Sequence, residues 1–223
     1  SERSLCRREK IDLGEVRAMK NMFDAPFEWE EIGYSSCPAK IVRTIATKFP
    51  QEIRVLEIGT AYGKQLPSFA PFCERVVCVD AMYDWVPDIG RTTPHDPKKV
   101  DKAKIDEWNR NVEPFREKTR LFVGNSFDMH RDLELRSAAS GSNVIVVDGC
   151  HHPAEAVRDD YLNFFPLMAL PHYAVFDDMQ FGDCERGLKM SLEWLSSEGL
   201  LFAVSPEATK SGIRGKAVYV WRA

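Results

Sequence analysis

The sequence has no apolar run that approaches the length of a membrane-spanning helix, and its N-terminal stretch, SERSLCRREKIDLGEV, contains no segment typical of a signal peptide. None of its six cysteines forms a C-x-x-C pair, which favours free thiols in a reducing compartment over a disulfide framework. A basic stripe is also missing, because the net charge of −4 is made up of both signs spread along the chain. We therefore expect a cytoplasmic protein without a membrane or nucleic-acid partner.

The length and composition predict one globular domain. The chain has 223 residues, of which 44% are hydrophobic and 29% are charged, and this is enough apolar material for a large core. We assign the domain to residues 36–223. Residues 1–35 are less regular but contain Phe23, Phe27 and Trp29, so we expect this N-terminal extension to pack on the domain.

Short apolar runs alternate with longer amphipathic segments along the chain. Five of these runs are continuously apolar, which is typical of parallel strands covered on both faces: residues 54–58, 75–80, 120–124, 143–148 and 173–178. Two more runs, at 200–205 and 216–221, flank a turn-rich segment and predict a C-terminal antiparallel hairpin. The pattern predicts a doubly wound α/β fold with a seven-stranded, mostly parallel sheet, in which ligands bind beyond the carboxyl ends of the strands.

A glycine loop follows the first strand in the segment RVLEIGTAYGKQ. Gly59 and Gly63 permit a tight turn, and Asp80 at the end of the second strand can accept hydrogen bonds from both hydroxyls of a ribose. This combination indicates a cofactor that contains a nucleoside. The dinucleotide fingerprint G-x-G-x-x-G fails at Ala61 and Lys64, so a nicotinamide oxidoreductase is the least favoured interpretation.

The spacing E-x-G-x-x-x-G in this loop resembles the first motif of the class I S-adenosylmethionine-dependent methyltransferases. The resemblance implies S-adenosylmethionine as the cofactor, whose ammonium and sulfonium groups suit an acid such as Glu57. In that family the end of the third strand commonly lies near the adenine, which implies a role for Asn125 and Ser126, although Ser126 is equally suited to cap a helix. The residues expected to bind the cofactor are Glu57, Gly59, Thr60, Ala61, Tyr62, Gly63, Asp80, Ala81, Asn125, Ser126 and Asp148.

Three acids follow the fourth and fifth strands. Asp148 ends the fourth strand in NVIVVD, and Asp177 and Asp178 end the fifth in YAVFDD. Adjacent strands bring such carboxylates together, where they repel one another unless a proton or a cation intervenes. Oxygen ligands with positions left for water and substrate suit Mg²⁺ or a similar divalent cation, so we expect the three acids to be metal ligands. The alternative is that two of them cap helices and face water.

The segments VIVVDGCHH and YAVFDDMQF resemble a narrower group, the macrocin O-methyltransferase and cephalosporin-hydroxylase-like families. The resemblance implies that the three strand-end acids hold a divalent metal and that His151 is the general base. The neighbouring His152 is a rival base. Cys150 replaces the second acid of the group's D-G-D-H motif, a departure that weakens the expected orientation of His151.

The favoured interpretation is a Mg²⁺-dependent O-methyltransferase that acts on a hydroxyl of a small molecule, such as a sugar or a natural product. The metal would lower the pKa of the hydroxyl, and His151 would accept its proton. The alternatives are a hydroxylase-like or metal-independent enzyme on the same fold and a non-catalytic binding module. We expect residues 1–35 and the long loop at 82–100 to select the substrate. The sequence leaves open whether the protein forms a homo-oligomer.

Overall fold

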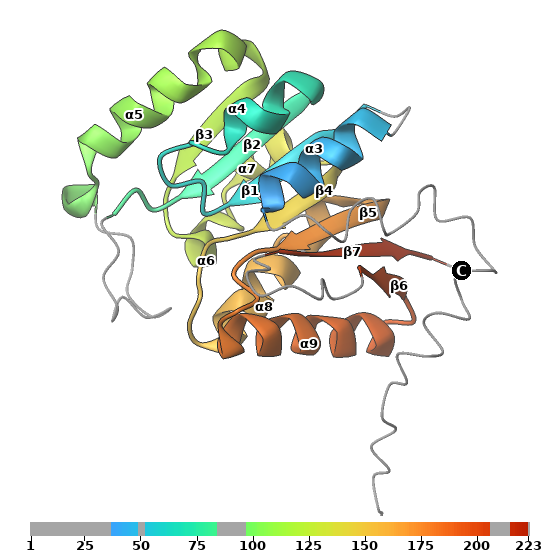
Figure 1. Cartoon of the computed structure of the whole chain (residues 1–223). Coiled ribbons are helices and arrows are strands. Elements are labelled where there is room, and N and C mark those ends of the chain that lie inside the picture. The colour runs from blue at the N-terminus through green and yellow to red at the C-terminus, as the bar shows by residue number, and fades with distance from the viewer. Residues whose placement is uncertain (1–36, 49–51, 84–96, 206–214, 223) are drawn as a thin grey trace, which may run out of the picture.

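The computed structural model shows a central sheet with helices on both faces (Figure 1). It describes residues 37–48, 52–83, 97–205 and 215–222. The expected N-terminal extension at 1–35 lies outside these ranges, as does most of the loop at 82–100. Within them, no helix has both the length and the apolar character needed to cross a bilayer.

The sheet contains seven strands in the order β3-β2-β1-β4-β5-β7-β6. The strands are β1 Arg54–Ile58, β2 Arg75–Asp80, β3 Thr119–Val123, β4 Ser142–Val147, β5 Met168–Phe176, β6 Leu201–Val204 and β7 Lys216–Trp221. Strands β1 to β5 pair in parallel, whereas β7 runs antiparallel between β5 and β6. This confirms the predicted doubly wound sheet with a C-terminal antiparallel hairpin. Because β1 to β5 are parallel, the segments that follow them emerge at the same edge of the sheet.

One face of the sheet is covered by the helices α3 Pro38–Lys48, α4 Leu66–Phe69 and α5 Lys102–Val112. The helical spacing of Ile41 and Ile45 on α3, and of Trp108 and Val112 on α5, turns these side chains toward the strands, where all are buried in one cluster with Val55. Each large side chain buried in this way contributes about 1.5–3 kcal/mol to stability.

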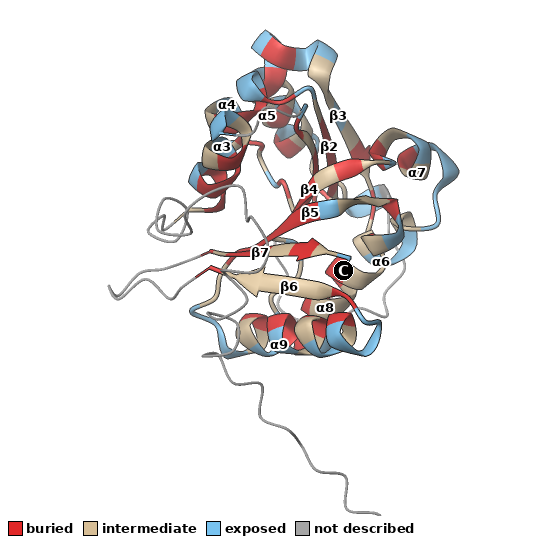
Figure 2. Ribbon diagram, turned by 90° about the vertical axis from the view of Figure 1, so that its right-hand side faces the viewer, coloured by how far each residue is buried: buried red, intermediate tan, exposed pale blue. Residues whose placement is uncertain are grey.

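The other face is covered by α7 Leu133–Ala139, α8 Ala154–Leu162 and α9 Gly182–Ser197. Side chains alternate between the faces along a strand, so Leu56 of β1 joins this second cluster, together with Val157 and Tyr161 of α8 and Leu188 of α9. The two clusters bury both faces of the central strands, whereas the edge strand β6 is only half-buried (Figure 2). This double burial explains why the strand segments read as continuous apolar runs.

Several boundaries differ from the sequence-based prediction. Strand β5 begins at Met168, before the expected residue 173, and β6 spans Leu201–Val204 rather than 200–205. The remaining short elements are α6 Ser126–Met129 and the 3₁₀ helices Ala70–Phe72, Pro97–Lys99, Glu113–Lys118 and Phe165–Leu167. None of these differences moves a strand end at the carboxyl edge by more than a residue or two, so the residues that follow β1 to β5 still lie along that edge.

Candidate active site

The loop after β1 is a tight turn held by Asp80. Gly59, Ala61 and Gly63 have φ angles of 88°, 47° and 67°, a backbone region that non-glycine residues adopt at a cost. Asp80 Oδ2 accepts the N–H of Ala61 at 2.7 Å, and Asp80 Oδ1 accepts the N–H of Met82 at 2.6 Å. Asp80 therefore stabilises the loop, and each of its oxygens retains a lone pair that a ligand hydroxyl can use.

Gly59 and Gly63 are required by close contacts within the protein. A Cβ on Gly59 would lie 2.0 Å from the backbone oxygen of Asp148 and 2.6 Å from Cα of Gly149. A Cβ on Gly63 would lie 2.7 Å from Cδ1 of Trp108. At Gly59 the backbone after β4 comes close to the glycine loop, which fixes this loop directly against Asp148.

Glu57 is an acid buried on the α5 side of the sheet, with 3% of its surface exposed. Burial raises its pKa from 4.5 to about 7, a hydrogen bond with Thr60 lowers the pKa, and the charge of Asp148 raises it further. The thiol of Cys78 also donates to Glu57 Oε2 at 3.5 Å. The acid in the middle of the apolar strand is therefore poised between its neutral and ionised forms near neutral pH.

Helix α5 supports the rest of the glycine loop. Thr60 is buried, and its Oγ1 accepts the side-chain N–H of Trp108 at 3.3 Å. The carbonyl oxygen of Tyr62 accepts a hydrogen bond from Nδ2 of Asn111 at 2.8 Å. Ala81 is half-buried directly after β2. These contacts place the predicted loop residues together at the carboxyl ends of β1 and β2.

Asn125 and Ser126 stand where β3 leads into α6. Asn125 is the N-cap of α6, because its side chain accepts the N–H of Phe127 at 3.0 Å. Ser126 is the first residue of the helix, and its hydroxyl donates to Oδ1 of Asp160 on α8 at 2.6 Å. The capping role considered for Ser126 thus belongs to Asn125, and the Ser126 hydroxyl is directed toward α8.

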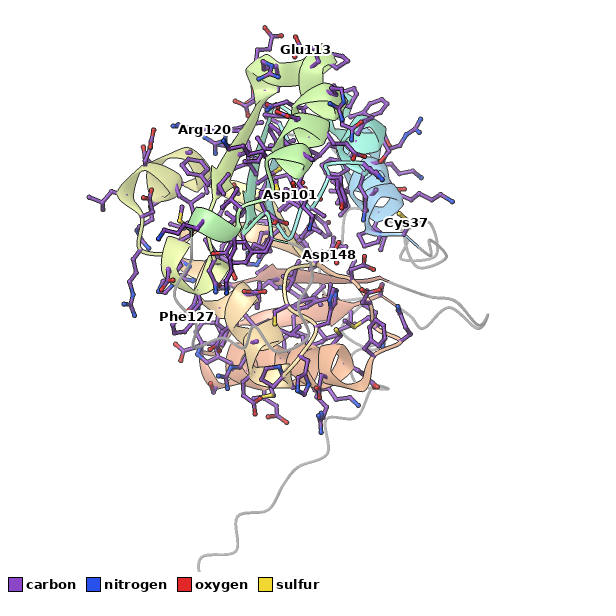
Figure 3. The ribbon with its side chains drawn as sticks, turned by 90° about the vertical axis from the view of Figure 1, so that its left-hand side faces the viewer. Cys37, Asp101, Glu113, Arg120, Phe127 and Asp148 are labelled. Atoms are coloured by element: carbon purple, nitrogen blue, oxygen red, sulfur yellow. The ribbon has the colours of Figure 1, made fainter. Side chains whose placement is uncertain are left out.

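Asp148, His151 and Asp178 form one group, with ligand atoms that lie within 4.8 Å of one another. His151 Nε2 is 2.8 Å from Asp178 Oδ2 and 3.5 Å from Asp148 Oδ1. This nitrogen is buried, yet neither contact has the geometry of a hydrogen bond. The two acids follow the adjacent parallel strands β4 and β5, and Figure 3 shows Asp148 near the middle of the molecule.

Asp177 does not join this group. Its Oδ1 accepts the N–H of Asp178 at 2.7 Å, which supports the φ angle of 53° at Asp178. Asp177 is also buried, with 7% of its surface exposed. Consecutive residues after a strand point in different directions, so only one of the paired acids faces Asp148. The structure thus groups two acids and His151, in place of the three acids that the sequence suggested.

Asp148 and His151 shift each other's pKa. Burial is the largest cause that raises the pKa of Asp148, while the close contact with His151 and its charge lower it. Interaction with Asp148 is the largest cause that raises the pKa of His151 above 6.5, the charge of Asp178 adds to it, and burial opposes it. A proton or a cation at this position stabilises both carboxylates at once.

An open hollow of about 690 Å³ lies beside His151. It is lined by His151, His152, Phe181, Gly182, Asp183 and Arg186. The ring of Phe181 is half-exposed, and its centroid is 6.0 Å from that of His151. His152 is largely exposed and pairs with Asp183, which also pairs with Arg186. His151, rather than its rival His152, is therefore the histidine that contacts the strand-end acids.

The sequence belongs to a known family. A family model described as a methyltransferase domain matches residues 56–179, which is more than half of the chain. The chain is therefore a member of the methyltransferase-domain family. Among curated proteins, no sequence matches it.

Solved methyltransferase structures share the fold along nearly the whole chain. The O-methyltransferase TomG from Streptomyces achromogenes, in complex with S-adenosylmethionine, has 15% identity and a TM-score of 0.62, and the match covers 98% of this chain and 93% of TomG. An O-methyltransferase from Bacillus cereus has 14% identity and a TM-score of 0.58, with 98% and 94% of the two chains covered. The N-methyltransferase NodS from Bradyrhizobium japonicum has 16% identity and a TM-score of 0.53, with 90% and 99% covered. At these identities the likeness shows the fold alone.

The family match and the seven-stranded sheet together define a class I, S-adenosylmethionine-dependent methyltransferase, as the E-x-G-x-x-x-G spacing predicted. Asp160, a buried acid that contacts Ser126, was not among the predicted site residues. A signal for it existed, because Asp160 lies on the same helical face as the apolar Val157 and Tyr161, where an acid requires buried partners.

Proposed function

We propose that this methyltransferase transfers a methyl group from S-adenosylmethionine to a hydroxyl of a small molecule, such as a sugar or a natural product, with Mg²⁺ or a similar divalent cation at the site. One observation carries the proposal: Asp148, His151 and Asp178 meet between the glycine loop and an open hollow. This arrangement brings a cofactor loop, a base and a cation site to one place.

The residues at the ends of β1 and β2 fit the cofactor. Asp80 can accept the ribose hydroxyls while it holds the loop through Ala61. Glu57 has a pKa of about 7, so a cationic ligand nearby favours its ionised form. The ammonium and sulfonium of S-adenosylmethionine supply such charges, and the cofactor supplies the methyl group.

The donor set near β4 and β5 also fits a divalent cation. Two carboxylates face each other across His151, and the Nε2 of His151 is buried without a hydrogen bond. Mg²⁺ is usually held by one or two carboxylates and keeps several waters, so Asp148 and Asp178 suffice as ligands. A cation held by these two carboxylates would lower the pKa of the acceptor hydroxyl. If His151 is itself a ligand, the mixed set of oxygen and nitrogen donors suits Mn²⁺ better than Mg²⁺.

In this proposal His151 accepts the proton of the acceptor hydroxyl at Nε2. Asp178, 2.8 Å away, stabilises the imidazolium that results. Phe181 forms an apolar wall of the hollow on which the substrate packs. The contact of Gly59 with the backbone of Asp148 keeps the cofactor loop aligned with the base, and alignment supplies a large part of the rate in such displacements.

Calorimetric titration with S-adenosylhomocysteine tests cofactor binding. We expect a single site in the full chain, and the absence of binding would leave only a non-catalytic module on this fold. Treatment with EDTA followed by Mg²⁺ or Mn²⁺ then tests the cation requirement. Turnover that survives EDTA unchanged would exclude a catalytic metal and leave a metal-independent transferase.

Product mass separates the remaining alternatives. A hydroxylated small molecule that gains the mass of a methylene group has been methylated, whereas a gain of one oxygen identifies a hydroxylase-like reaction. Fragmentation of the methylated product then shows whether oxygen or nitrogen carries the new methyl group.

A further inference from the structure

The carboxyl group of Asp160 on α8 is buried, with 5% of the residue exposed. The apolar Val157 and Tyr161 flank it on the same helical face and pack in the core cluster below the sheet. A buried carboxylate is costly unless its oxygens are hydrogen-bonded. The partners of Asp160 therefore account for an acid at this position.

Each oxygen of Asp160 holds a different loop of the site. Oδ1 accepts the hydroxyl of Ser126 at 2.6 Å, and Oδ2 accepts the N–H of Cys150 at 3.1 Å. Ser126 follows β3, and Cys150 directly precedes His151 after β4. Strands β3 and β4 are separated in the sheet by β2 and β1, so strand pairing does not join these two ends directly.

Gly149 leaves room for this arrangement. A Cβ on Gly149 would lie 2.7 Å from Asp160 Oδ2 and 2.9 Å from Cγ2 of Ile58. Gly149 is not among the glycines with positive φ, so its backbone conformation alone does not require glycine. The glycine of the segment DGCHH is instead explained by the close approach of Asp160.

We propose that Asp160 is a positioning residue that holds the His151 loop in register with the loop at Ser126 after β3. It acts through the Cys150 amide and the Ser126 hydroxyl. The functional consequence rests on the proposed function, in which His151 serves the acceptor, and on the sequence-based expectation that the end of β3 at Ser126 lies near the adenine of the cofactor. The structural claim, that the carboxylate of Asp160 joins the two loops, depends only on these two hydrogen bonds.

Hydrogen exchange of the full chain without ligand tests whether Asp160 joins the two loops. In Asp160→Ala, we expect the Cys150 amide and the Ser126 loop to exchange at least about tenfold faster, because both lose a hydrogen bond to a buried carboxylate. Strand β2 is expected to keep its wild-type rate. Asp160→Asn retains an oxygen for the Cys150 amide and a donor for Ser126, so its rates stay within about threefold of wild type. Asp159→Asn, the same change one position away, is the control and leaves both loops unchanged.

Binding measurements test the functional consequence. Substitution of residues that orient metal ligands typically lowers metal affinity by about 10–100-fold, and we expect a loss of this size for Mn²⁺ in Asp160→Ala. Affinity for S-adenosylhomocysteine is expected to fall as well, while both affinities stay near wild type in Asp160→Asn and Asp159→Asn. A wild-type chain that binds no Mn²⁺ contradicts the proposed metal, yet the exchange rates still decide the role of Asp160.

Two results would overturn the inference. One is exchange in Asp160→Ala that is unchanged at Cys150, and the other is an acceleration spread equally over the whole chain. If Asp160→Ala does not fold, Gly149→Ala replaces it, because the added methyl group displaces Oδ2 of Asp160. Wild-type exchange at Cys150 in that variant also overturns the inference.

Discussion

Replacement of Glu57 by glutamine is expected to stabilise the protein at high pH and to weaken cofactor binding. Glu57 is buried and its pKa is raised from 4.5 to about 7, chiefly by desolvation. Glutamine has nearly the same shape and carries no charge that burial can destabilise. The substitution therefore separates the energetic cost of this acid from its proposed use as the partner of a cationic ligand.

The sign and size of the stability effect follow from the two pKa values. Below pH 4.5 Glu57 is protonated in both the folded and unfolded chains and has no effect on the difference between them. As the pH rises to 7, the unfolded chain ionises while the folded chain resists, so stability is lost over this window. A shift of this size corresponds to about 3 kcal/mol, which Glu57→Gln should recover at pH 8 and not at pH 4.5.

Urea unfolding of the wild type and Glu57→Gln at both pH values measures this difference. Calorimetry with S-adenosylhomocysteine, which retains the ammonium group, is expected to show at least about tenfold weaker binding by Glu57→Gln, since a charge-assisted hydrogen bond is lost. Glu74→Gln is the control, because Glu74 is exposed and its ion pair with Arg54 lies at the surface. A variant that gains no stability at pH 8, or that binds as tightly as wild type, would refute the reasoning.

Three further predictions concern other parts of the fold. Gly59→Ala should lower the free energy of unfolding by more than about 2 kcal/mol, because the added methyl group would lie 2.0 Å from a backbone atom. Gly199→Ala is the control: its φ is 69° and nothing lies within 4 Å, so it should lose only about 1 kcal/mol for the unfavourable backbone conformation. Equal losses of the two variants in urea unfolding would contradict this. Asp178→Asn should weaken Mn²⁺ binding by at least about tenfold and change S-adenosylhomocysteine binding by less than about twofold, and Asp183→Asn should change neither, as read by calorimetry. Burial lowers the pKa of His172 to about 4, so below pH 6.5 the unfolded chain takes up a proton that the folded chain resists, and the free energy of unfolding should fall by up to about 3 kcal/mol as the pH falls to 4. His172→Gln should reduce this dependence of the unfolding free energy on pH, as measured by urea unfolding. An unchanged dependence would exclude His172 as its cause.

The strands of the fold were accessible from the sequence because burial on both faces leaves a local signature. The run in β4 is apolar at each position from Val144 to Val147, and the structure buries all of them. The start of β5 was harder to place, because its first residues, from Met168 to Leu170, are only half-buried and lack that signature. The position of β7 between β5 and β6 could not be predicted from the sequence either, since either strand of a hairpin can pair with the sheet.

The candidate site was partly accessible for a similar reason. Parallel strands end at one edge, so Asp148 and Asp178 had to lie near each other once β4 and β5 were adjacent. Which acid of the pair faces Asp148 depends on the turn after β5, where Asp177 bonds to the next backbone N–H. The sequence therefore predicted which segments lie close together but not the orientation of each side chain.

The sequence by itself determined the class of fold, the glycine loop, and the set of polar residues at the strand ends, because each of these depends on neighbours close in the chain. Only the tertiary structure decided that His151 lies between two acids, that Gly59 packs against the backbone of Asp148, and that Asp160 links two loops. Contacts of this kind join residues far apart in sequence, and they depend on directions and distances of a few ångströms that no local pattern of residues specifies.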